Sequence, residues 1–191
     1  MGYLCVARRG GAAVSGGKTA EELFKAWYED VLAMLYPHRD AGIAIFMISL
    51  PLTERYLRQK SNLGPDADLS DDFMRCLVKI FSALRDVATA RQFWAAYRNG
   101  FLHQATLSTS TRRGTLLPIG WLTHDIADSI QIIPDGSFCV HPELFSKKIV
   151  SEIKADFATF AGTVAGAPPL AKVEGFHPIT MHSMPIGTRG G

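Results

Sequence analysis

The chain has 191 residues, of which 47% are hydrophobic, so it is long enough to bury a substantial core in one domain with appendages. Its formal net charge of +2 excludes binding of nucleic acid through bulk positive charge, and any such contact has to be local. The three cysteines are scattered and form no CxxC pair, which argues against a disulfide scaffold and against a zinc site.

The N-terminal residues 1–17 are rich in Gly and Ala and predict a flexible arm. Their paired arginines are followed by more glycine instead of an apolar core, so no secretory signal is expected. Residues 12–19 also satisfy a loose phosphate-loop pattern, in which Lys18 would hold phosphates and Thr19 a magnesium ion. Because the following helices lack the alternating strands of a parallel sheet, the phosphate loop is the weaker interpretation of this segment.

Two helices are predicted next. Thr19 offers an N-cap with Glu22 three positions on, and the helical pattern that follows ends at Pro37. Asp40 then caps a second helix, which Pro51 should kink or break. The longest apolar run of the chain lies in this second helix and is too short to span a bilayer, so we expect no membrane span and a cytoplasmic location.

Two further amphipathic helices are predicted over about 70–84 and 86–105. Four consecutive helices with short connections predict a mainly α, up-down bundle. The pattern then changes: a strand and a hairpin that turns at Asp135-Gly136 predict a β extension over about 116–140.

Pro142 opens a closing helix over about 142–160, which we expect to pack back onto the bundle. The predicted domain therefore covers about 18–160 and is a four- to five-helix bundle with a small C-terminal β-hairpin. Residues 161–191 lack periodicity and predict an irregular tail.

The fourth predicted helix carries a cation, an amide and an imidazole in an otherwise apolar segment, as Arg98, Asn99 and His103. On an unbroken α-helix Asn99 and His103 share a face, and Arg98 is long enough to reach the same point. RNA cleavage without a metal needs a group of near-neutral pKa to move protons and a fixed cation to hold the phosphate. His103 suits the first role and Arg98 the second, while Asn99 would position the phosphate or the imidazole.

A late bundle helix with Arg, a polar residue directly after it and His five positions on resembles the HEPN superfamily (higher eukaryotes and prokaryotes nucleotide-binding). The resemblance covers roughly 19–106. It implies either a metal-independent endoribonuclease of toxin or defence type, or a non-catalytic module that binds nucleotides or RNA. It also implies a homodimer across the motif helix, an antitoxin as a candidate partner, and no cofactor or metal.

A purely structural interpretation of the motif stays open, in which Arg98 pairs with a buried acid and His103 fills a polar gap in the bundle. Glu54 is the best-placed acid to orient Arg98, although it can equally pair with Arg58 on its own helix, four residues on.

Four other polar or aromatic residues are weaker candidates. Arg112 and Arg113 follow the motif helix and are either a solvated loop or a phosphate-binding extension. Tyr97 is either part of the core or, if exposed, a ring that stacks on a base. His124, with two aspartates nearby, is a polar surface residue in preference to a metal ligand.

Overall fold

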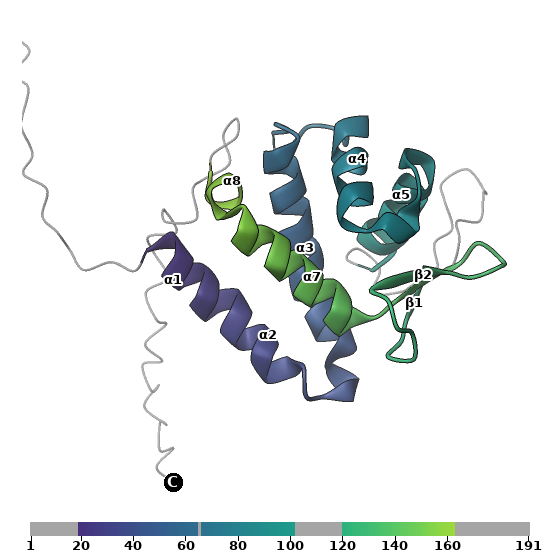
Figure 1. The fold of residues 1–191 in the computed structure, drawn as a ribbon, viewed down its shortest axis with the longest axis horizontal. Helices are drawn as coiled ribbons and strands as arrows, with labels where there is room; N and C mark the ends of the chain where they lie inside the picture. The colour runs from purple at the N-terminus through teal and green to yellow at the C-terminus, as the bar shows by residue number, and fades with distance from the viewer. Residues whose placement is uncertain (1–18, 65, 102–119, 163–191) are drawn as a thin grey trace, which may run out of the picture.

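A computed structural model of the protein describes residues 19–64, 66–101 and 120–162, with the backbone alone for 99–101. This part of the chain is mainly helical and has a small three-stranded sheet at one end (Figure 1). The predicted arm over 1–17 and the predicted tail beyond residue 162 lie outside the described residues. Within the described residues, no helix is both long and apolar enough to cross a membrane.

The first helical run begins where the capping pattern predicts. It comprises the α-helix α1 (Ala20–Phe24), the π-helix η1 (Lys25–Glu29) and the α-helix α2 (Asp30–Leu35). The Thr19 hydroxyl accepts a hydrogen bond from the Glu22 backbone N–H at 3.1 Å, and the Glu22 carboxylate accepts one from the Thr19 N–H at 2.7 Å. This reciprocal pair satisfies two N–H groups that the first turn leaves without helical partners.

The second predicted helix, α3 (Gly42–Lys60), differs from expectation at two places. Asp40 does not cap it: a 3-10 turn, η2 (Arg39–Ala41), precedes the helix, and the N-cap is Ala41 without a side-chain hydrogen bond. Pro51 does not break it, because the ring lies on the exposed side, where it has room.

The next two predicted helices begin at their expected caps, Ser70 and Asp86, whose side chains accept backbone N–H hydrogen bonds. The third predicted helix is shorter than expected, because the chain leaves the helical conformation at Phe81 and Arg85 adopts a φ of 59°. The elements here are α4 (Asp71–Ile80), the 3-10 turn η3 (Ser82–Leu84), α5 (Val87–Trp94) and η4 (Ala95–Phe101). Since η4 is a π-helix, the regular α-helix expected through the motif is wrong over these residues.

The sheet is not the simple hairpin that the sequence predicts. Its strands are β1 (Gly120–Leu122), β2 (Ile130–Ile132) and β3 (Phe138–Val140), in the order β1-β3-β2. The pair β2 and β3 is antiparallel, and Gly136 has the positive φ of 84° that a tight turn needs. The predicted hairpin is incomplete because it lacks β1, which pairs with β3 in parallel. Such a pairing joins distant segments, and no local turn signal indicates it.

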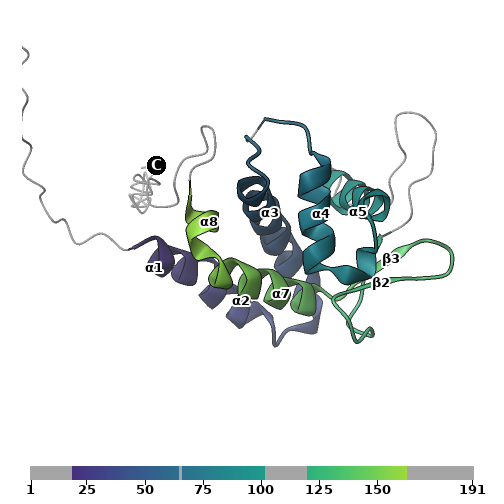
Figure 2. The same ribbon diagram turned by 45° about the horizontal axis from the view of Figure 1, so that its top comes forward.

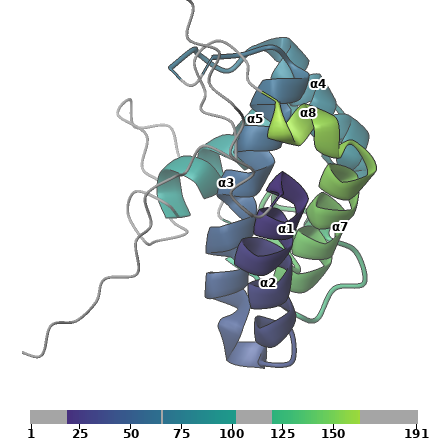
Figure 3. The same ribbon diagram turned by 90° about the vertical axis from the view of Figure 1, so that its left-hand side faces the viewer.

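The closing helix starts at Pro142, as predicted, but consists of two pieces, α7 (Pro142–Ala155) and α8 (Phe157–Ala161). The long helix α3 packs against α7, α8 and α4. The α1–α2 run lies alongside α3 and α7 (Figure 3), while α4 and α5 lie on the other side of α3 (Figure 2). The core draws on all of these helices and the sheet, with fully buried rings that include Phe46, Phe93 and Phe145. Cys76 and Cys139 are free thiols.

Candidate functional site

Arg98 is the motif residue whose side chain the structure describes. It lies on η4 and forms an ion pair with Glu54 of α3, with 3.4 Å between the Arg98 Nε and the Glu54 Oε2. The Glu54 side chain is 17% exposed and the Arg98 side chain 34% exposed. The carboxylate therefore holds the base of the guanidinium in place, while a third of the side chain stays open to solvent.

Glu54 also pairs with Arg58, so both pairings that the sequence allows are present. The Arg58 Nε donates to the Glu54 Oε1 at 2.9 Å. Its Nη1 donates to the backbone carbonyls of Gly64 at 2.8 Å and Ala67 at 3.0 Å. The Glu54 carboxylate thus lies between the guanidinium groups of Arg98 and Arg58. Arg58 also holds the loop that follows α3.

Arg58 and Arg98 line one groove together with a third arginine, Arg91 of α5. The groove has a volume of about 740 Å³, and we call it the arginine groove. The loop over 66–69 and Met74 also line it. Asp66 and Asp68 of this loop add negative charge, so the groove is lined by both signs.

Arg91 is fixed at the other end of this groove. Its Nη2 donates to the Asp71 carboxylate at 2.6 Å and its Nη1 to the Leu69 carbonyl at 3.3 Å. The Arg91 hydrogen bond and charge hold the pKa of Asp71 below its ordinary value. Sequence reasoning missed Arg91, although a signal was present: it precedes Arg98 by seven residues, two turns of a helix.

Trp94 and Ala95 line the arginine groove between these two arginines. The Trp94 ring contacts Phe73 edge to face, with 4.9 Å between ring centroids. Its Nε1 atom is buried and has no hydrogen-bond partner within the described residues. A buried N–H without an acceptor costs free energy. The indole N–H of Trp94 beside the groove is such a donor, as far as the described residues show.

Tyr97 is part of the core, one of the two alternatives that the sequence leaves open, and so it is not available to stack on a base. Its ring is fully buried, and its hydroxyl lies 2.9 Å from the Phe138 carbonyl oxygen and 3.0 Å from that of Trp121. Burial raises the pKa of the Tyr97 phenol. A Cβ atom at Gly120 would lie 2.7 Å from the Tyr97 Cζ, so the ring also requires glycine at that position. Tyr97 therefore joins the motif helix to the sheet.

The remaining motif residues lie outside what the structure describes in atomic detail. His103, Arg112 and Arg113 fall in the segment 102–119, and Asn99 is described by its backbone alone. Their roles stay predictions.

His124 packs edge to face on a second histidine, His141, with 4.9 Å between ring centroids. The His141 Nδ1 accepts a hydrogen bond from the Leu144 N–H at 3.3 Å and so caps α7. Burial, and then the neighbouring His124, lower the pKa of His141. Among the residues described, no cluster of three or more His, Cys, Asp or Glu side chains is arranged to hold a metal ion.

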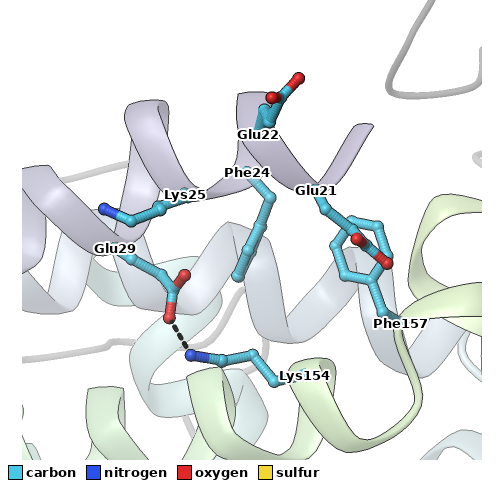
Figure 4. A pocket seen from close by; sticks show the side chains of 7 residues that line it. All are labelled: Glu21, Glu22, Phe24, Lys25, Glu29, Lys154 and Phe157. Atoms are coloured by element: carbon cyan, nitrogen blue, oxygen red, sulfur yellow. Dashed lines mark hydrogen bonds and ion pairs between the residues drawn. The ribbon is translucent and has the colours of Figure 1, made fainter. Parts of the chain in front are cut away.

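A second depression, of about 300 Å³, lies between α1–η1 and α7–α8 (Figure 4). Phe24 and Phe157 form its apolar part, and the Lys154 Nζ lies 2.7 Å from the Glu29 Oε1 across it. Three of its lining residues are glutamates and two are lysines, so it offers an anion less positive charge than the arginine groove.

No protein-family model, curated protein or solved structure matches this chain.

Proposed function

We propose that this chain is an RNA-directed protein that holds a backbone phosphate in the arginine groove and cleaves the RNA without a metal ion. The observation that carries this proposal is the placement of Arg98. Its guanidinium is oriented by Glu54, one third of its side chain is exposed, and it lines a groove with two other arginines. π-helical turns such as the one that holds Arg98 occur frequently at functional sites.

The proposed chemistry uses the RNA itself as the nucleophile. The 2′-hydroxyl oxygen attacks the adjacent phosphorus, its proton passes to a base, and the 5′-oxygen leaves with a proton from an acid. We assign the proton transfers to His103, the stabilisation of the extra negative charge on the phosphate to Arg98, and the positioning of the phosphate to Asn99. Glu54 is a positioning residue that acts through Arg98.

The experiment measures degradation of single-stranded RNA with EDTA present. We expect His103→Ala to abolish cleavage and Arg98→Gln to lower the rate by roughly 100-fold or more. Arg75→Gln is the matched control, because Arg75 is a surface arginine of α4 that does not line the groove. Full cleavage by His103→Ala, or loss of its fold in a thermal melt, would contradict the assignment of His103.

A non-catalytic module that binds nucleotides or RNA is the second candidate. It is supported by the way the groove is built: hydrogen bonds of Arg58 to Glu54 and to the carbonyls of Gly64 and Ala67 hold its described residues together. RNA binding that depends on Arg98, without cleavage in any variant, would favour this candidate.

A HEPN-type bundle that forms a cytoplasmic homodimer across the motif helix, with an antitoxin as a further partner, is part of the proposal. An apolar surface next to Glu54 supports a second copy of the chain. Ile43 is 58% and Met47 50% exposed, and both lie on the same face of α3 as Glu54. A dimer in analytical ultracentrifugation that Met47→Glu dissociates is the expected result, and a monomer for the unmodified protein would contradict it.

A further inference from the structure

The two arginines on the α5–η4 helix, Arg91 and Arg98, both line the arginine groove and are seven residues apart. Arg91, Trp94, Ala95 and Arg98 all line it, at intervals of three, one and three residues. Seven residues of helix separate the Cα atoms of Arg91 and Arg98 by roughly 10 Å. The helix lines the groove between them with the small side chain of Ala95 and with Trp94, which is 3% exposed, so no large side chain of this helix stands out between the two cations.

Arg91, like Arg98, is paired with a carboxylate and stays partly exposed to solvent. A carboxylate, Asp71, and the Leu69 carbonyl hold its guanidinium, while 47% of its side chain is exposed. A guanidinium carries five N–H donors, and these contacts engage two of its nitrogens. A fixed and partly exposed arginine is suited to contact a phosphate, because little side-chain freedom is lost on binding.

We infer that the arginine groove binds two separate phosphates of one RNA strand, one at Arg98 and the other at Arg91. This inference rests on the proposed function and specifies its substrate as a strand that continues past the phosphate at Arg98. The phosphates of a nucleoside diphosphate share a bridging oxygen and are closer together than two phosphates of a strand. In a polynucleotide, a ribose separates successive phosphates, and the strand can follow the wall over Ala95.

The experiment uses a fluorescent octauridine with 2′-O-methyl groups, which cannot be cleaved because the nucleophile is blocked. Its affinity is measured by anisotropy over a range of salt concentrations for the unmodified protein, Arg91→Gln, Arg98→Gln and Arg75→Gln. Each lost phosphate contact should reduce the slope of log K against log salt by about 0.7 for a single strand. We expect this reduction for Arg91→Gln and for Arg98→Gln. Arg75→Gln is the matched control, because Arg75 also contacts Asp71 but lies outside the groove.

A second measurement uses uridine monophosphate as a competitor. We expect its affinity to fall with Arg98→Gln and to stay unchanged with Arg91→Gln. An equal loss in both variants would place both arginines on one phosphate and overturn the inference.

The two proposals fail in different ways. If the octauridine binds through Arg98 but Arg91→Gln keeps the full affinity and salt slope, the inference is wrong and the proposed function stands. If the unmodified protein does not bind the octauridine, the proposed function is wrong and the inference falls with it.

Discussion

The Tyr97 hydroxyl lies 2.9 Å from the Phe138 carbonyl oxygen. Tyr97 directly precedes Arg98, the arginine on which the proposed function depends. Through this contact and a second one to Trp121 at 3.0 Å, the sheet is attached to η4. The position of Arg98 in the groove therefore depends on the sheet as well as on the helix that carries it.

Tyr97→Phe tests this attachment. The substitution leaves two carbonyl oxygens without their donor in a buried site, so we expect a loss of about 1–3 kcal/mol in the free energy of unfolding. Urea unfolding followed by circular dichroism measures it. Tyr28→Phe is the control, because the Tyr28 hydroxyl makes no hydrogen bond within the described residues. An equal, small effect for both substitutions would contradict a special role of the Tyr97 hydroxyl.

Gly120→Ala tests the packing between β1 and the same ring. The new Cβ atom would lie 2.7 Å from the Tyr97 Cζ, and a ring held by two hydrogen bonds has little room to shift. We expect a destabilisation of about 1–3 kcal/mol. In a double-mutant cycle with Tyr97→Leu, which removes the ring, the two costs should be clearly less than additive. Additive costs would show that the ring is not what excludes a side chain at Gly120.

Asp66→Asn and Asp68→Asn test the electrostatics of the arginine groove. Both aspartates line the groove beside its arginines, and their negative charges oppose the approach of an anion. We expect each substitution to raise the affinity for RNA several-fold at low salt, with a smaller gain at high salt because of screening. Asp72→Asn, on the exposed first turn of α4, is the control. Weaker binding by the groove variants would mean that these carboxylates contact the ligand directly.

The His141 cap predicts a pH dependence of stability. The pKa of His141 in the folded protein is below its ordinary value of 6.5, so folding favours the neutral ring. Its contribution to stability is fully present above about pH 6.5 and is lost as the pH falls through the lowered pKa. A protonated Nδ1 also cannot accept the Leu144 N–H.

Thermal melts between pH 7.5 and 5 measure this dependence. His141→Asn keeps a capping oxygen but does not titrate, so we expect a flatter profile for this variant. The neighbouring Glu143, Asp125 and His124 also face this position and contribute in both proteins. A profile that is the same with and without His141 would contradict the prediction.

Local signals in the sequence predict local structure well here. Thr19 with Glu22, Ser70, Asp86 and Pro142 start helices in the structure because each satisfies or avoids a free backbone N–H within its own turn. Such signals need only a few neighbouring residues, so they can be interpreted without knowledge of the fold.

What the sequence does not predict depends on contacts between distant segments. The parallel pairing of β1 with β3 and the meeting of Arg58 with the α5–η4 helix in one groove both arise from packing between elements. An acid on an apolar helix needs a cation, and the sequence left Glu54 with two alternative partners, Arg98 and Arg58. That Glu54 pairs with both became clear only once the helices were placed.

Arg98 lies within the π-helix η4, and this conformation affects the direction in which its side chain leaves the helix. A π turn takes one residue more than an α turn to close each hydrogen-bonded ring. Deleting a single alanine, Ala95 or Ala96, would remove that extra residue and let the coil close as an α-helix, so the residues that follow would keep nearly the same direction. The π turn thus lets the chain carry one more residue before Arg98 without turning the cation away from its carboxylate.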